Sequence, residues 1–492
     1  MLEPVIEYMP ILVFFLGAMF CLVFDYKKKA TRLFLILIPV VSILFIVSQI
    51  LQPMSSSSMN LSLADEGLFM ILICIVFSIF VLINWFEDFK NQNVEIFSHA
   101  LGFLITGSIL GFIYSDNLFL VGIFTLMTQV FMTLLKFISS ASNKKVLNLL
   151  LFLFCLGFIF FLIGCLILFQ SSGTSQLFLS SFNVASVPLP ALVFIFLGML
   201  INIGAFPISY LVYHNIFSNS HVSIKIFYLL FHSIIAWKFL KISDILSLFG
   251  PVYTVIYFIL GLVNIFTGIG LIFHEIIYSQ ERKLNNLISS SIIVDFGVII
   301  ALIGMLGEIR DQPVDPDILE SLIMDQHYII VLQVIITMLT KIVFIASGKN
   351  VEKIFQDDLM DEMGGLKFSR PSTLVGFLLG GLGNVILGIF VMDGIYKNLN
   401  GFIAMVPGTI FISGIFLFFI FIIIALFTIT WFAFALVKIF GGNLPIRIKS
   451  APRTVLRNED ATIILMVILN IAMLVILILA PSLSFLDFIM SV

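Results

Sequence analysis

Residues 285–307 read NNLISSSIIVDFGVIIALIGMLG, an apolar run with a single ionisable side chain, Asp295, close to its centre. An α-helix needs about 20 such residues to cross the hydrocarbon core of a bilayer. A carboxylate inside such a helix costs at least about 2.5–3.5 kcal/mol on insertion scales, so it is expected to face other helices. The run therefore predicts a transmembrane helix that packs inside a helical bundle.

The whole chain has the composition of this run. Its 492 residues are 61% hydrophobic and 11% charged, and the mean hydropathy is +1.19. Soluble domains carry roughly 25% charged residues, so the charges here are too few for a water-soluble surface. The 25 Lys and Arg against 28 Asp and Glu leave a net charge of −3, which excludes a basic nucleic-acid-binding domain. Because helices fit these runs and alternating strands do not, the composition predicts an all-α polytopic protein surrounded by lipid.

Apolar runs of spanning length recur along the chain and predict about 14 transmembrane helices. They lie at 9–24, 31–52, 67–86, 96–115, 117–136, 146–169, 189–213, 222–246, 252–277, 285–307, 326–348, 372–397, 402–438 and 461–485.

Basic residues support this number of helices, because most of the 25 Lys and Arg fall in alternate loops. On the opposite side the sequence places only Lys238, Lys241, Arg310 and Lys397, and Lys341 lies within a span. Cytoplasmic loops of membrane proteins are enriched in Lys and Arg. We therefore expect a multi-pass protein of the cell (plasma) membrane, with both termini outside and its large cytoplasmic loops at 349–370 and 439–460.

Two other features carry little chemistry. The four cysteines stand in apolar runs without the CxxC spacing of metal or iron–sulfur sites, and no Gly-rich phosphate loop is present, so no cofactor and no metal are expected. The cysteines are Cys21, Cys74, Cys155 and Cys165. The acidic stretch 308–326 is interpreted as a solvated loop, with a cation site as the alternative.

Three stretches carry a more specific signal. In chain order they are residues 202–223 (NIGAFPISYLVYHNIFSNSHVS), residues 279–304 (SQERKLNNLISSSIIVDFGVIIALIG) and residues 337–366 (TMLTKIVFIASG, then DEMGGL). In order and spacing they resemble conserved stretches of the antiporter-like subunits. This family of membrane subunits is shared by respiratory complex I, Mrp-type cation/proton antiporters and energy-converting membrane-bound hydrogenases, and the resemblance extends over roughly 100–440.

The resemblance implies a single transmembrane domain over 1–492 with two inverted five-helix repeats. Helices 4–8 (96–246) form the first repeat and helices 9–13 (252–438) the second, with accessory helices 1–3 in 1–95 and a C-terminal helix at 461–485. The family breaks helices 7 and 12 near the midplane. Here the first break is expected at Gly204 and Pro207, and the second at Gly388 and Gly394, where both family prolines are missing.

The family moves protons along a midplane chain of Lys, His and Glu, and several of these positions are replaced. The helix 5 glutamate falls at Leu126, the helix 7 lysine at Asn202 and the helix 11 histidine at Thr337. Gln129 is the nearest polar substitute for the glutamate, and it does not ionise. The resemblance therefore implies a degenerate first half-channel.

Five residues remain as candidates for an ion path: His232, Asp295, Lys341, Asp393 and Lys397. The resemblance matches Lys341 to the family's helix 11 lysine and places Lys397 one residue short of the helix 12 lysine. Each candidate also has a structural interpretation. His232 would be a neutral buried histidine, Asp295 a protonated hydrogen-bonded aspartate and Lys341 a snorkelling lysine. Asp393 and Lys397 would be an interfacial pair spaced four apart on one helix.

The function expected from the resemblance is that of a proton- or sodium-translocating subunit in a redox-driven, hydrogenase-like or NADH:quinone oxidoreductase-like complex. The chain itself is expected to hold no redox centre. Its partners are expected to be other membrane subunits and a peripheral redox arm on the cytoplasmic side. Two alternatives remain open: a non-conducting structural subunit of the same kind of complex, and an autonomous secondary transporter.

Overall fold

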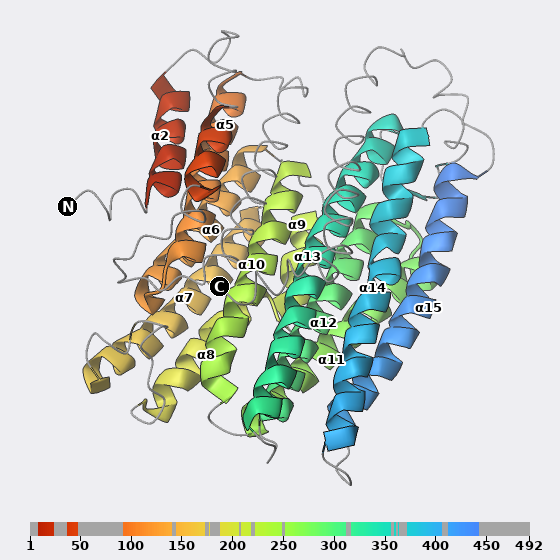
Figure 1. Cartoon of the computed structure of the whole chain (residues 1–492). Helices are drawn as coiled ribbons and strands as arrows, with labels where there is room; N and C mark the ends of the chain where they lie inside the picture. Colours follow the sequence, from red (N-terminus) through yellow and green to blue (C-terminus); the bar gives the residue numbers. More distant parts are fainter. Residues whose placement is uncertain are drawn as a thin grey trace. The chain divides into compact units, whose positions relative to one another are not determined.

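The computed structural model describes fourteen stretches of the chain, and every regular element in them is helical (Figure 1). The described residues are 8–23, 37–47, 92–139, 144–172, 177, 187–205, 208–217, 222–247, 251–310, 316–355, 359–360, 363, 371–405 and 412–441. The expected helices at 67–86 and 461–485, and Pro207, lie outside them.

The chain divides into two compact units. The first comprises residues 1–202, 219–234 and 471–492, and the second comprises 203–218 and 235–470. The first unit contains α2 (Met9–Val23), α5 (Gln92–Tyr114), α6 (Leu118–Ser139), α7 (Lys144–Ser172) and nearly all of α8 (Leu189–Ile203). A further helix covers Leu37–Val47. The next long helix, α10 (Val222–Ser247), belongs to the first unit up to Ile234 and to the second unit beyond it.

Besides the end of α10, the described part of the second unit contains α9 and five long helical segments. These are α9 (Ile208–Phe217), α11 (Pro251–Phe273), which continues as the π-helical turn η4 (His274–Tyr278), α12 (Leu284–Arg310), α13 (Pro316–Phe355), α14 (Pro371–Met405) and α15 (Ile412–Phe440). Within this unit α12 packs against α9, α11 and α13, and α14 packs between α13 and α15. The helix that contains Asp295 is therefore surrounded by other helices.

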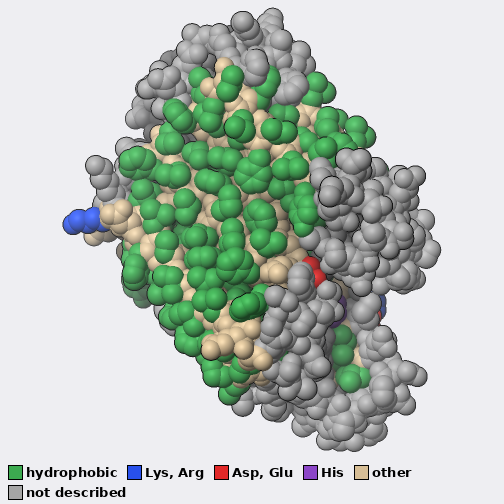
Figure 2. Space-filling view, turned by 90° about the vertical axis from the view of Figure 1, so that its left-hand side faces the viewer, with side chains coloured by type: hydrophobic (Ala, Val, Ile, Leu, Met, Phe, Trp, Pro, Cys, Tyr) green, Lys and Arg blue, Asp and Glu red, His purple; other side chains and the backbone are tan. Residues whose placement is uncertain are grey.

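Seven helices in the described part of the chain are long and apolar enough to cross a membrane. They confirm an all-α, multi-pass membrane protein. Their burial differs: α12 is 94% buried along its spanning window, whereas α15 is only 28% buried. Large hydrophobic side chains such as Phe152, Leu166 and Leu426 are exposed, and Figure 2 shows a face on whose described part hydrophobic side chains predominate. Lipid is the solvent that suits such a face, whereas α12 forms the interior of its unit.

Glycine lets α11 and α12 approach closely. A Cβ atom at Gly268 would lie 2.6 Å from Val294 Cγ2, and one at Gly297 would lie 2.7 Å from the backbone nitrogen of Ile265. Gly261 faces the backbone of Ala301 at a still shorter distance. The hydrophobic effect does not drive helices together within lipid. Small residues at a crossing instead let the backbones approach closely, so that van der Waals packing stabilises the contact.

The first of the two expected helix breaks is present as an interruption between α8 and α9. The α-helix ends at Ile203, Gly204 adopts a left-handed backbone with φ of 68°, and helix resumes at Ile208. Only glycine adopts this conformation without steric cost. The hydroxyl of Tyr213 donates to the freed carbonyl of Ile203 at 3.4 Å, which partly replaces the lost backbone bond.

The second expected break, at Gly388 and Gly394, was wrong. Helix α14 runs without interruption from Pro371 to Met405 through both glycines. The physical reason is that this helix has no proline after Pro371: glycine weakens a helix but keeps its N–H donor, so the hydrogen-bond ladder remains complete.

The acidic stretch 308–326 is also not entirely a loop. Helix α12 extends to Arg310 and α13 already begins at Pro316, so much of the stretch is helical. Proline suits the first position of a helix because its missing N–H would have no partner there.

Candidate functional site

A buried ion pair joins α12 to α13 in the second unit. Lys341 Nζ lies 3.0 Å from Asp295 Oδ2, with side chains only 2% and 10% exposed. The same ammonium donates to Ser291 Oγ at 3.0 Å, and the Ser291 hydroxyl donates onward to the carbonyl of Ile288 at 2.8 Å. Because Ser291 and Asp295 are four residues apart, they share one face of α12 and meet Lys341 together. The structure thus pairs the two strongest candidates from the sequence.

The position of this pair makes it energetically demanding. Asp295 lies 11 residues, or about 16 Å at 1.5 Å per residue, from the start of α12, near the middle of a helix long enough to span a bilayer. Isolated charges at that depth are costly, and mutual attraction offsets the cost only when the geometry is good and further hydrogen bonds are made. Here the serine supplies such a bond. Ionisable residues within a membrane span are typical of ion pathways in membrane proteins.

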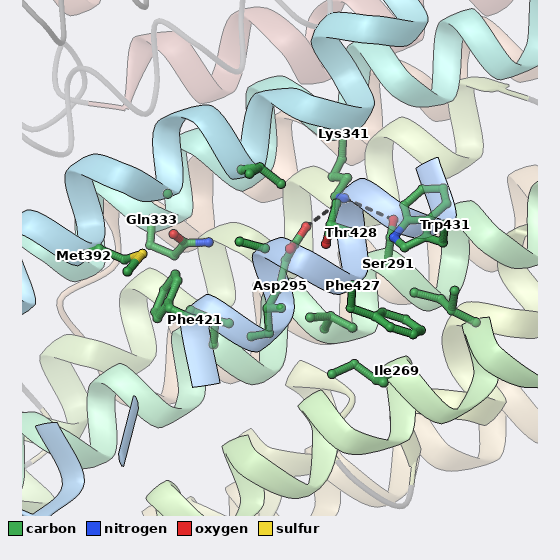
Figure 3. Close-up of a pocket in the computed structure, with 17 residues that line it drawn as sticks. Ile269, Ser291, Asp295, Gln333, Lys341, Met392, Phe421, Phe427, Thr428 and Trp431 are labelled. Carbon is green, nitrogen blue, oxygen red and sulfur yellow. Dashed lines mark hydrogen bonds and ion pairs between the residues drawn. The ribbon is translucent and has the colours of Figure 1, made fainter. Parts of the chain in front are cut away.

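A cavity opens beside the pair (Figure 3), with about 40 Å³ in which the centres of water molecules fit. Helices α11 to α15 all contribute to its wall. The lining residues are Ile269, Ile272, Ser291, Val294, Asp295, Val298, Gln333, Lys341, Val385, Gly388, Met392, Phe421, Ile424, Ala425, Phe427, Thr428 and Trp431. Most of the wall is apolar and the polar groups are few. A cavity of this size has room for a few water molecules and is too small for an organic ligand.

Sequence reasoning missed three polar residues of this cavity: Ser291, Gln333 and Thr428. A signal for Gln333 was present, because Gln333, Thr337 and Lys341 are spaced four apart on one face of α13. Gln333 Nε2 donates to Thr337 Oγ1 at 3.2 Å. Thr337 is therefore part of a polar line that leads along α13 to Lys341.

Asp393 and Lys397 form a separate pair at the far end of α14. Lys397 Nζ lies 2.7 Å from Asp393 Oδ2, and the side chains are 73% and 54% exposed, respectively. Neither residue lines the cavity, although Met392 next to Asp393 does. An exposed i,i+4 pair is worth a few tenths of a kcal/mol, so this pair is not a buried charge centre.

In the first unit, a hydrogen bond joins two buried amide side chains. Gln129 Nε2 donates to Asn202 Oδ1 at 3.2 Å, and both side chains are buried. Gly157 of α7 packs directly on the asparagine, since a Cβ there would lie 2.7 Å from Asn202 Oδ1. Leu126, three residues before Gln129, is half-buried and has no polar group in its side chain. The contact between Gln129 and Asn202 is uncharged at any physiological pH.

His232 is fully buried in the same unit. Its Nδ1 lies 2.7 Å from the carbonyl of Tyr228, one turn earlier on α10, and its ring stacks on the Tyr228 ring at 5.8 Å. The Tyr228 hydroxyl in turn lies 3.5 Å from Thr133 Oγ1. A histidine bonded to its own helix in this way fits a neutral structural role at least as well as a proton relay.

Two of the three sequence stretches that carry the family resemblance meet in space. Lys283 and Leu359 form an isolated β-bridge, and Met360 N donates to the carbonyl of Arg282 at 2.8 Å. Buried Glu275, in the π-helical turn, accepts hydrogen bonds from the Lys283 backbone N–H and from Asn286 Nδ2. These stretches therefore tie the start of α12 to the segment that follows α13, which fixes the two helices that carry the ion pair.

Comparison with known proteins adds a likeness in fold. No protein-family model and no curated protein sequence matches the chain. Among solved structures, the chain is similar to a chain in the structure of the membrane-bound sulfane sulfur reductase (MBS), an archaeal respiratory membrane complex. The TM-score is 0.71 at 14% sequence identity, over 93% of this chain and 74% of that chain. At this identity the likeness establishes the fold.

Proposed function

We propose that this chain is an antiporter-like membrane subunit of a multisubunit redox-linked ion pump, and that its second unit carries H⁺ or Na⁺ past Lys341 and Asp295. The observation that carries the proposal is the buried Lys341–Asp295 pair beside a cavity at membrane depth. A pair whose partners separate and rejoin exposes a carboxylate that an incoming cation neutralises. The likeness in fold to a chain of MBS supports a respiratory membrane complex as the setting.

A second candidate is a structural subunit that seals and spaces the membrane arm of such a complex. The Gln129–Asn202 amide pair favours it, because a neutral contact replaces the charges that the family uses in this half. In both candidates the partners are other membrane subunits and a redox arm that docks on the cytoplasmic loops. In both, the redox chemistry belongs to those partners.

Ion flux through membrane vesicles separates the two candidates. Vesicles that contain the chain in its native assembly are given a K⁺ diffusion potential with valinomycin, and trapped pyranine and ²²Na⁺ report H⁺ and Na⁺ movement. We expect Lys341→Ala and Asp295→Asn each to lower the flux of one of these ions by about tenfold or more, the effect of a barrier raised by about 1.4 kcal/mol.

Two matched variants serve as controls. Lys349→Ala removes a lysine of the same helix that pairs with Glu352 at 3.3 Å in a partly exposed position, and Gln129→Leu breaks the amide pair. Both are expected to keep wild-type flux. Wild-type flux in Lys341→Ala or Asp295→Asn, at equal protein amounts, contradicts the pump and favours the structural subunit. Full transport by the chain purified alone identifies an autonomous transporter instead.

A further inference from the structure

Gln333 carries a polar atom that the ion pair does not use. The side chain is 4% exposed and lines the cavity, and its Nε2 donates to Thr337 Oγ1. Its carbonyl oxygen Oε1 has no hydrogen-bond partner in the described part of the chain. A buried amide oxygen without a partner costs free energy, and proteins commonly satisfy such atoms with ordered water.

The cavity provides both the room and the partners that such water needs. It has space for the centres of a few water molecules, and polar groups of Asp295, Ser291 and Thr428 line it together with Gln333. Figure 3 shows the Gln333 amide beside the cavity on the side of Asp295, with Met392 and Phe421 as apolar neighbours. An apolar wall alone would leave the space dry.

The spacing along α13 connects this amide to the ion pair. Gln333, Thr337 and Lys341 follow at intervals of one turn, each about 6 Å further along the axis. Gln333 Nε2 and Thr337 Oγ1 are in direct contact across the first of these turns, at 3.2 Å. A water molecule can bridge the second turn, from Thr337 to Lys341.

We propose that Gln333 is an internal water site, which holds a short chain of ordered water molecules against the Lys341–Asp295 pair. The presence of these waters does not depend on the proposed function. Their role does: in it they hydrate the pair and bring the ion to it. Gln333 acts through water and is therefore a positioning residue. The waters accept and donate protons without any covalent change to the protein.

The chain offers a matched control on the same helix. Gln326 is also a fully buried glutamine of α13, but its Nε2 donates to the carbonyl of Leu302 at 3.0 Å, and it does not line the cavity. Gln326→Leu therefore removes an amide of the same kind and should leave the cavity unchanged. Gln333→Leu removes the proposed water site.

Radiolytic hydroxyl-radical labelling of the assembly, read by mass spectrometry, tests the site without measuring transport. Trp431 lines the cavity and is 1% exposed, so internal water is the source of radicals for it. Trp237 is equally buried, does not line the cavity and serves as the reference. We expect Trp431 to be labelled several-fold more than Trp237 in the wild type and in Gln326→Leu, and to fall to the level of Trp237 in Gln333→Leu.

Equal labelling of Trp431 in the wild type and in Gln333→Leu overturns the water site, as does labelling of Trp431 no higher than that of Trp237 in the wild type. Gln333→Met, which fills the same volume, carries the same expectation if the leucine variant does not fold. The outcome is distinguishable from that of the proposed function. Wild-type flux in Lys341→Ala removes the pump and leaves the water site standing, whereas unchanged labelling in Gln333→Leu removes only the water site.

Discussion

At the scale of single residues, the Lys341–Asp295 pair shows how position decides the value of a charge. Lys397 and Asp393 are closer to each other, at 2.7 Å, yet both are largely exposed to the surroundings. Lys341 and Asp295 are buried among apolar side chains, where removal of one partner leaves a charge without compensation. The two pairs should therefore respond very differently to substitution.

We predict that Lys341→Met and Asp295→Leu each destabilise the chain by about 3 kcal/mol, whereas the double variant recovers most of this loss. Each single variant leaves one buried charge, and the double variant leaves none. Lys397→Met should change stability by less than about 1 kcal/mol. Thermal unfolding of the full chain in detergent measures all four variants. A double variant as unstable as the sum of the singles would show that the pair is not buried as described.

The sequence predicts the members of the site better than it predicts their contacts. Asp295 and Lys341 are noticeable because ionisable residues are rare within apolar runs. Their pairing depends on how α12 and α13 rotate against each other, which the pattern of each helix alone does not specify. Gln333 is not noticeable in the sequence because an amide is uncharged. Its place in the cavity makes it informative, together with an oxygen that has no partner among the described residues.

At the scale of helices, hydropathy predicts where spans lie but not where helices end. The apolar run at 326–348 belongs to α13, which extends from Pro316 to Phe355. Helix ends depend on capping and on neighbouring segments, such as the bridge between Lys283 and Leu359 that follows α13. The uninterrupted α14 illustrates the same limit, since glycine spacing alone does not break a helix.

The contact between α11 and α12 gives a prediction at this scale. Gly261→Val places a branched side chain against the backbone of Ala301, so the helices must separate; we expect a loss of about 2 kcal/mol or more in stability. Gly270→Val is the matched control on α11, because no atom lies within 4 Å of the position of its Cβ. Thermal unfolding compares the two. Equal stability of both variants would contradict the close approach of these helices.

At the scale of the whole molecule, the scarcity of charge organises both topology and site. With only 11% charged residues, each basic group in a loop contributes to orientation, and each ionisable group inside a span needs a partner. The all-α membrane fold followed from composition because few other structures satisfy the backbone in lipid. The division into the two described units did not follow from composition, since it depends on contacts between distant segments.

Orientation in the membrane is the prediction that belongs to this scale. Because Lys and Arg concentrate in alternate loops, we expect alkaline phosphatase fused to the C-terminus to be active and a fluorescent protein fused there to be dark. Fusions after residue 360, in the basic stretch 349–370, should give the reverse. Removal of Lys349, Lys353, Lys367 and Arg370 together should weaken this asymmetry. Active phosphatase after residue 360 would show that the topology is the reverse of the one predicted, with the stretch 349–370 outside.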